Sequence, residues 1–110
     1  MTQKDMIQAQ LLEMRRGTIV LAILSHLGTP RYGYELLQRL EHASFVIDAG
    51  TLYPLLRRLE KQGVLQSEWS TTDNRPRKYY RLSKEGVRFY DDLKREWHDM
   101  TTTINTMIKE

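Results

Sequence analysis

The fold is decided near the middle of the chain by residues 50–63, which read GTLYPLLRRLEKQG. Asp48 precedes this stretch at the place of a helix N-cap, and Gly63 closes it where a left-handed residue ends a helix. We therefore predict a helix over residues 49–62, slightly distorted where Pro54 removes a hydrogen bond. Its leucines recur at the spacing of one helix face, which we expect to pack on the core: Leu52, Leu55, Leu56 and Leu59.

Two further helices are predicted before this stretch. Residues 5–27 are good helix formers, and Gly28 follows them as a stop signal, so we expect one N-terminal helix within residues 1–28. Its second half is apolar nearly all round, which places it at the centre of the fold. The next helix is expected over residues 32–43, with a stripe formed by Leu36, Leu37 and Leu40.

The chain after Gly63 alternates apolar and polar residues in the manner of a β-hairpin. Residues 64–71 and 77–82 form the expected strands, and the turn between them is Asp73-Asn74-Arg75-Pro76. Ser83 then caps a last helix that runs to about Ile108. The order helix, helix, helix, hairpin, helix predicts a mostly α fold with a small β-hairpin.

Composition limits the function without identifying a partner. A chain of 110 residues can bury one core, and its net charge of +3 is ordinary for a soluble domain. There is no cysteine, which excludes disulfides, thiolate nucleophiles and cysteine-ligated zinc. The start of the chain lacks a secretory signal pattern, and the most apolar stretch, residues 18–27, is too short to span a membrane. We therefore expect a cytoplasmic protein without a membrane partner.

Two basic clusters in adjacent elements favour DNA as the partner. The outer face of the middle helix carries Gly50, Thr51, Tyr53, Pro54, Arg57, Arg58 and Lys61, of which Tyr53 is interpreted as an exposed aromatic. The hairpin adds Arg75, Arg77 and Lys78 at or beside its tip. Such a helix fits the major groove, and such a hairpin can contact the adjacent backbone or minor groove. Each cluster alone is also typical of a solvated helix face or a charged strand edge, but their adjacency favours DNA.

The last helix carries a heptad-like seam that indicates dimerisation. Its apolar residues are spaced alternately three and four apart: Tyr90, Leu93, Trp97, Met100, Ile104 and Met107. The seam could cover the chain's own first helix, but it is longer than a small core needs, so we favour a homodimer. Trp97 is then either an interface anchor or a platform that stacks a flat aromatic ligand.

Together these features predict a winged helix-turn-helix with a long C-terminal dimerisation helix. The DNA-binding domain is expected over residues 1–82, with the N-terminal helix of residues 1–28 also contributing to the dimer interface. The dimerisation helix is expected over residues 83–110. A two-fold dimer would read two half-sites of a pseudo-palindromic operator in successive major grooves.

Three stretches resemble the PadR family of transcriptional regulators, in its short subfamily. They are residues 31–35 (RYGYE), residues 50–63 (GTLYPLLRRLEKQG) and residues 75–86 (RPRKYYRLSKEG). The resemblance extends over nearly the whole chain. It implies a winged-helix dimer that represses transcription and is released by small molecules. It also implies a further DNA-contacting residue, Tyr34, beside those of the helix and the hairpin.

The C-terminal helix, with a tryptophan at its middle, further resembles that of the lactococcal multidrug resistance regulator of this family. That likeness implies a planar aromatic or phenolic effector held between the tryptophans of two subunits. Carried over by position, the effector pocket is lined by Leu11, Met14, Thr18, Trp97, Met100, Thr101 and Ile104.

Other functions fit the sequence less well. The three histidines are scattered and lack metal-site spacing, and no phosphate loop or nucleophile elbow is present, so we expect no enzyme, metal or cofactor. A winged-helix module that binds only protein should carry an apolar or acidic outer face on the middle helix, whereas this face is basic. A drug-binding protein with secondary DNA binding stays open as an alternative.

Overall fold

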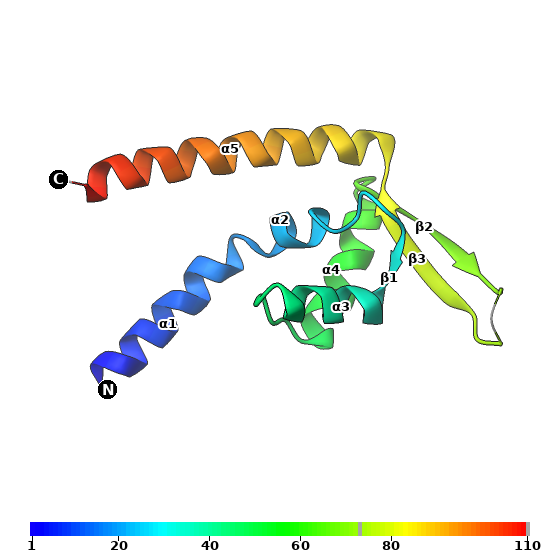
Figure 1. The fold of residues 1–110 in the computed structure, drawn as a ribbon, viewed down its shortest axis with the longest axis horizontal. Helices are drawn as coiled ribbons and strands as arrows, with labels where there is room; N and C mark the ends of the chain where they lie inside the picture. Colours follow the sequence, from blue (N-terminus) through cyan, green and yellow to red (C-terminus); the bar gives the residue numbers. More distant parts are fainter. Residues whose placement is uncertain (73, 110) are drawn as a thin grey trace.

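The computed structural model describes residues 1–72 and 74–109. Asp73, at the start of the predicted turn, lies outside the described residues. Within them the chain forms five helices and three strands (Figure 1). In chain order these are α1 (Gln3–Arg16), α2 (Ile19–Leu24), β1 (Arg31–Tyr32), α3 (Gly33–His42), α4 (Ala49–Lys61), β2 (Leu65–Ser70), β3 (Arg77–Leu82) and α5 (Lys84–Ile108).

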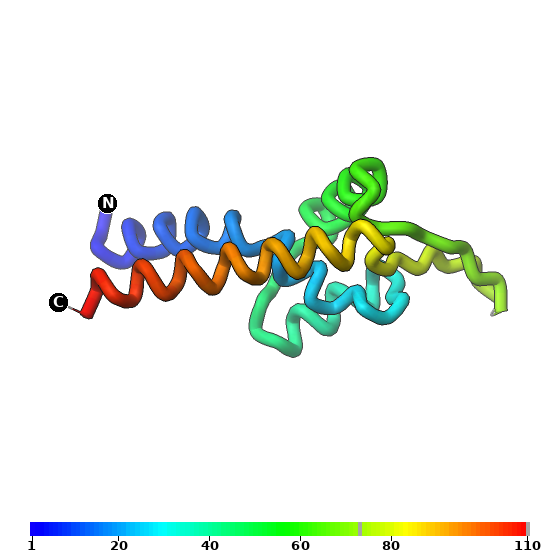
Figure 2. The backbone as a smooth tube through the Cα atoms, turned by 90° about the horizontal axis from the view of Figure 1, so that it is seen from above, coloured from blue at the N-terminus to red at the C-terminus, as the bar shows by residue number. Residues whose placement is uncertain are grey.

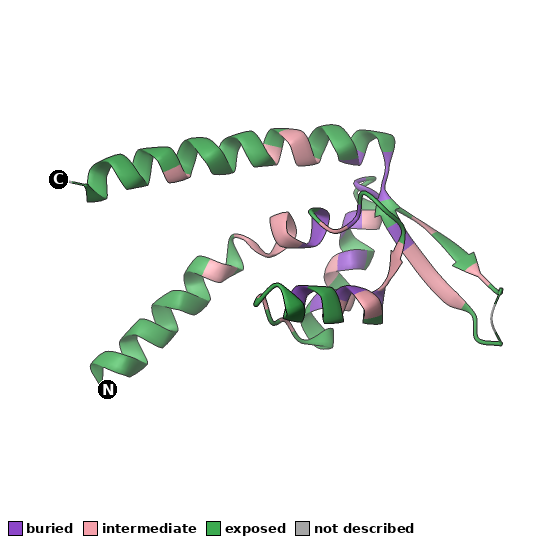
Figure 3. Cartoon of the chain, viewed as in Figure 1, coloured by how far each residue is buried: buried purple, intermediate pink, exposed green. Residues whose placement is uncertain are grey.

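The single N-terminal helix expected over residues 5–27 is wrong, because the structure divides it into α1 and α2. Gly17 has a low helix propensity, and the Thr18 hydroxyl donates a 2.8 Å hydrogen bond to the Arg15 carbonyl, so the turn closes there. The two pieces have different environments, since α1 buries no residue whereas α2 buries Ile23 and Leu24. Figure 3 shows α1 extending away from the buried part of the molecule.

The core lies where α2, α3, α4 and the sheet meet, as the predicted leucine stripes require. Its buried residues are Ile23, Leu24, Leu27, Leu36, Leu40, Leu52, Leu56, Leu59, Val64, Leu65, Tyr80 and Leu82. The end of α4 is as predicted: Gly63 has φ of 82°, and Val64 N–H donates to the Leu59 carbonyl at 2.9 Å. This is the Schellman bond that turns the chain from α4 into β2.

The hairpin is confirmed and gains a short third strand. The antiparallel sheet has the order β1-β3-β2, in which Arg31 pairs with Tyr80 and Tyr32 with Tyr79. A strand of two residues carries no readable periodicity, so the sequence did not predict β1. It joins the segment before α3 to the hairpin and thereby fixes the hairpin against the helices.

The last helix matches its prediction and leaves the core after its first turns. The Ser83 hydroxyl accepts the Gly86 N–H at 2.8 Å and caps α5. Tyr90 and Leu93 pack against the core, whereas the rest of the seam is exposed. Figure 2 shows α5 running along the molecule, whose longest extent is 55 Å. Both α5 and α1 therefore leave apolar faces uncovered in a single chain.

Candidate nucleic-acid interface

The outer face of α4 is exposed and basic, while its inner face is buried. Leu52, Leu56 and Leu59 are within the core, which orients the helix about its axis. That orientation exposes Gly50, Thr51, Pro54, Arg57, Arg58 and Lys61 together, as the sequence predicted. Because the leucine stripe is tightly packed, this face is presented on a rigid helix rather than on a loop.

Tyr53 corrects one expectation, because its side chain is half-buried rather than exposed. Its ring lies on Gly33 at the start of α3, where a Cβ would stand only 2.2 Å from Tyr53 Cε1. A side chain at position 33 would therefore collide with this ring, so the contact requires glycine. The neighbouring Tyr34 is the exposed aromatic here, so its side chain is accessible to a ligand.

A polar network that the sequence did not reveal joins α4 to the hairpin. Glu60 accepts a hydrogen bond from the Ser67 hydroxyl of β2, and its Oε1 lies 3.1 Å from Lys78 Nζ on β3. The Ser67 hydrogen bond, together with Lys78, lowers the pKa of Glu60. In turn Glu60 raises the pKa of Lys78. Lys78 therefore holds the hairpin against α4, and its charge is already paired within the chain.

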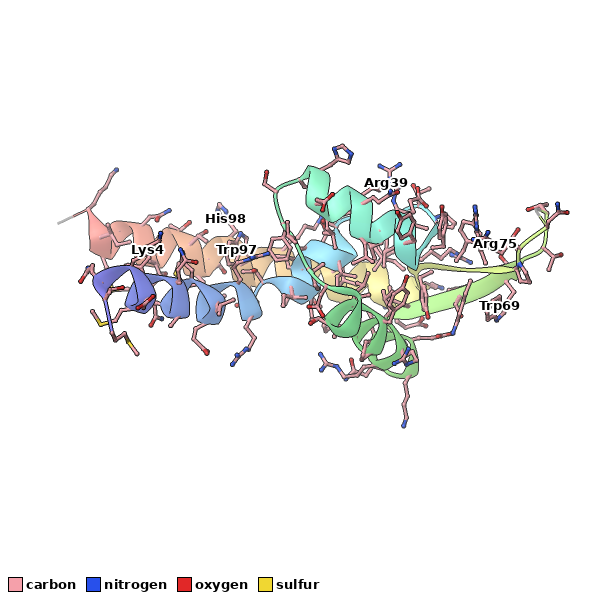
Figure 4. All side chains as sticks on the ribbon, turned by 90° about the horizontal axis from the view of Figure 1, so that it is seen from below. Lys4, Arg39, Trp69, Arg75, Trp97 and His98 are labelled. Carbon is pink, nitrogen blue, oxygen red and sulfur yellow. The ribbon has the colours of Figure 1, made fainter. Side chains whose placement is uncertain are left out.

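The other two basic residues of the hairpin differ in their surroundings. The Arg77 guanidinium stacks 4.6 Å from the centroid of the Tyr32 ring, which ties it to β1. Arg75 is exposed near the hairpin tip, as Figure 4 shows. Of the three predicted hairpin contacts, Arg75 is the one most accessible to a ligand.

The loop before α4 is held by Arg15 of α1, the helix that forms the N-terminal arm of the fold. Arg15 donates a 2.6 Å hydrogen bond from Nη2 to the Val46 carbonyl, and its guanidinium lies 4.7 Å from the centroid of the Phe45 ring. Asp48 occupies the N-cap position, but its carboxylate accepts the Thr51 hydroxyl at 2.7 Å instead of a backbone N–H. That bond lowers the pKa of Asp48.

The residues predicted to hold an effector lie on α1, in the turn that follows it and on α5 of one chain. Leu11 and Met14 are exposed on α1, and Trp97, Met100 and Ile104 are exposed on α5. Figure 1 shows that α1 and α5 diverge as they leave the core. The hydroxyls of Thr18 and Thr101 donate to carbonyls of their own segments, those of Arg15 and His98. A pocket made of this whole set therefore needs a second chain.

Residues 1–72 and 74–109 offer neither a metal site nor a membrane-spanning helix. No group of histidines and carboxylates within these ranges is arranged to hold a metal ion. No described helix combines the length and apolar character needed to cross a membrane.

The fold and the site define a winged helix-turn-helix protein of the DNA-binding class. Its features are the packed helices α3 and α4, the basic outer face of α4 and the adjoining antiparallel hairpin of β2 and β3. A model of the transcriptional regulator PadR-like family matches residues 20–92. The chain belongs to this family, whose members are DNA-binding transcriptional regulators rather than enzymes. The resemblance to the PadR family that the three sequence stretches indicated is thus confirmed.

Solved structures and curated relatives agree with this assignment. A PadR family transcriptional regulator from Eggerthella lenta is 43% identical with a TM-score of 0.90, over 96% of this chain and 94% of that one. A PadR-like regulator from Bacillus cereus is 27% identical with a TM-score of 0.79, over 89% and 98%. Transcriptional regulator Rv3488 of Mycobacterium tuberculosis is 39% identical over 75 residues, which are 67% of this chain and 70% of the relative.

Proposed function

We propose that this regulator is a homodimeric repressor that inserts α4 into the major groove of a pseudo-palindromic operator. The observation that carries the proposal is the exposed basic face of α4, opposite a leucine face that packs on the core. Side chains on such a face reach base edges while the helix itself stays in place. The hairpin then lies against the sugar–phosphate backbone beside the groove.

The roles of the individual residues follow from their exposure. Arg57 and Lys61 lie one turn apart along the centre line of the exposed α4 face, where they reach bases or phosphates. Arg58 and Thr51 flank them, Tyr34 extends from α3, and Arg75 reaches the backbone from the hairpin. Pro54 is exposed on the same face, whereas the half-buried Tyr53, Arg77 and Lys78 support this surface more than they extend from it.

Dimerisation is supported by the apolar seam that α5 leaves uncovered. Trp97, Met100, Ile104 and Met107 are 42%, 57%, 49% and 58% exposed in the single chain. A second copy that covers this seam, with help from Leu11 and Met14 of α1, would bury them. A two-fold dimer also supplies two α4 helices, which half-sites about 34–36 Å apart require.

The seam also suggests how the repressor is released. Trp97 lies at the middle of α5 with its ring exposed, so two copies bring two indoles toward one axis. A planar aromatic effector stacked between them would alter the spacing of the two α4 helices. Titration of a planar cationic dye should quench tryptophan fluorescence in the wild type, and Trp97→Ala should abolish this quenching.

DNA binding is tested by fluorescence anisotropy with a duplex from the gene's own upstream region and a scrambled duplex, over a series of salt concentrations. Tight binding to the first duplex with a steep salt slope supports the proposal, since each neutralised phosphate contributes about 0.9 to the slope. Arg57→Ala should weaken specific binding by about 1–3 kcal/mol, roughly 5- to 150-fold. The matched control is Arg88→Ala, an exposed arginine of α5 outside both basic surfaces.

The outcomes separate the competing functions. Equally weak binding to both duplexes, and to a randomised pool of duplexes, would contradict specific DNA recognition. Dye binding that persists without any DNA affinity would favour the drug-binding alternative. Repression itself is measured by in vitro transcription from the same upstream region, which the protein should lower and the effector restore.

A further inference from the structure

Trp69 is a large apolar side chain that the fold leaves uncovered on the hairpin. It is 65% exposed on β2. Among residues 1–72 and 74–109, its indole takes part in none of the hydrogen bonds, ring contacts or cation–π contacts that the structure contains. An indole costs free energy when it stays in water, and its N–H usually finds an acceptor when it is covered. Such a residue indicates a contact surface.

Strand pairing places Trp69 on the side of the hairpin that faces α4. Trp69 is opposite Lys78, and because alternate residues share a face, it lies on the same face as Ser67. This is the face on which Glu60 of α4 binds both Ser67 and Lys78. Trp69 is therefore two residues nearer the hairpin tip than Ser67. Figure 4 shows it on the same side of the hairpin as α4.

This position adjoins the proposed DNA surface. On this face of the hairpin the charge of Glu60 is paired with Lys78, while the neighbouring Glu68 lies on the opposite face of β2. Along α4, Glu60 is flanked by the exposed Lys61 and lies one turn from Arg57. A duplex that receives α4 in its major groove would bring the adjoining sugar–phosphate strand toward this face.

We propose that Trp69 is an additional DNA-contacting residue that binds the sugar–phosphate backbone of the operator. This inference rests on the proposed function. The apolar body of the indole packs on deoxyribose, and its Nε1–H, which is a donor only, donates to a phosphate oxygen. Backbone contacts carry no sequence information directly, so Trp69 raises affinity for every duplex alike.

A neutral backbone contact has a signature that separates it from the basic contacts. An indole releases no counterion, so its removal should lower affinity without changing the salt slope. Removal of Arg75 should reduce that slope by about 0.9 for each phosphate it neutralises. The two variants thus distinguish packing and hydrogen bonding from charge neutralisation on the same hairpin.

The first measurement is anisotropy for Trp69→Ala, Trp69→Phe and the control Gln66→Ala, an exposed neutral change on the opposite face of β2. We expect Trp69→Ala to bind specific and scrambled duplexes about tenfold more weakly, with an unchanged salt slope. Trp69→Phe, which keeps a ring but loses the donor, should fall between Trp69→Ala and the wild type. Because Trp69 is exposed, thermal melting by circular dichroism should show all three variants folded.

The second measurement is iodide quenching of tryptophan fluorescence with and without the specific duplex. The chain has two tryptophans, so Trp69→Phe leaves Trp97 of α5 as the internal reference. DNA should protect part of the wild-type fluorescence and leave the accessibility of Trp69→Phe unchanged.

The outcomes distinguish this inference from the proposal beneath it. If Trp69→Ala binds DNA as tightly as the wild type, the inference is overturned while the repressor proposal stands. The same holds if DNA does not protect the wild-type fluorescence from iodide. A loss of binding confined to the specific duplex also overturns it, because a backbone contact acts on all sequences. A wild type that binds neither duplex overturns both.

Discussion

Two glycines lie where atoms of another element come closer than a methyl group allows. A Cβ on Gly86 would stand 1.9 Å from the Val64 carbonyl oxygen, and a Cβ on Gly33 would meet the Tyr53 ring. Both contacts join elements that flank the proposed DNA surface: α5 to the α4–β2 turn, and α3 to α4. The absence of a side chain at each position therefore sets the distance between two elements.

Gly86→Ala should destabilise the protein by about 3 kcal/mol or more, because a backbone carbonyl cannot move aside as a side chain can. The measurement is urea denaturation followed by circular dichroism. Gly28→Ala is the matched control, since no atom lies within 4 Å of the Cβ that it would add. An equal loss of stability in both variants would contradict the argument from close approach.

The ion pair between Glu60 and Lys78 predicts a pH dependence. The folded-state pKa of Glu60 lies below the ordinary 4.5, so its contribution to stability is present above that pH and is lost as pH falls through the folded value. The folded-state pKa of Lys78 lies above the ordinary 10.5, so its contribution is lost as pH rises through that higher value.

Glu60→Gln should therefore make the free energy of unfolding depend less on pH at acid pH. It should also lower the free energy of unfolding at neutral pH. Thermal midpoints measured between about pH 3 and pH 7 test this expectation. The control is Glu41→Gln, an exposed carboxylate on α3. If Glu60→Gln loses stability at acid pH as steeply as the wild type does, this ion pair does not link stability to pH.

At the scale of elements, Arg15 of α1 contacts the segment that precedes α4. Arg15 joins α1 to the loop at Phe45 and Val46, a few residues before the N-cap Asp48. The guanidinium both donates to a backbone carbonyl and stacks on a ring, so two contacts fix it. The position of the arm is thereby linked to the start of the helix that we propose reads DNA.

Arg15→Ala should loosen this loop without unfolding the core. Hydrogen–deuterium exchange at residues 44–51 should accelerate about fivefold, as expected for the loss of roughly 1 kcal/mol of local contacts. Arg16→Ala is the matched control, because Arg16 is the neighbouring exposed arginine and pairs with Glu13 of its own helix at 3.3 Å. Equal exchange in the two variants would rule out the link.

At the scale of the whole molecule, a single chain has more apolar surface than its own core covers. The uncovered faces are those of α1 and of the distal half of α5, both of which extend beyond the winged-helix body. Burying one such large apolar side chain is worth about 1.5–3 kcal/mol. Several of them on one long seam favour association with a second copy over exposure to water.

Met100→Glu should convert the proposed dimer into a monomer, because it would place an unpaired charge in the seam. We expect the dimer to weaken by about 3 kcal/mol or more, at least about a hundredfold, with specific DNA binding lost in parallel. Light scattering after size-exclusion chromatography measures the mass. Thr102→Glu is the control, since Thr102 is exposed on α5 away from the seam. A dimer that survives Met100→Glu would place the interface elsewhere.

Much of the fold could be predicted because its signals are local in the sequence. The leucine spacing of α4, the left-handed Gly63 and the Ser83 cap each depend on residues within a few positions of one another. Binary patterning fixes which side of each helix is buried, so the exposed face of α4 was also readable. The same reasoning failed at Gly17, where a weak helix former within an apolar pattern ended α1.

The sequence by itself thus determined the order of the elements, the buried faces, the basic outer face of α4 and the membership of the PadR-like family. Only the tertiary structure decided that Tyr53 lies on Gly33, that Lys78 is paired with Glu60, that β1 completes the sheet and that Trp69 stays uncovered. These features join residues that are far apart along the chain. Their distances are set by the packing of the core rather than by any local periodicity.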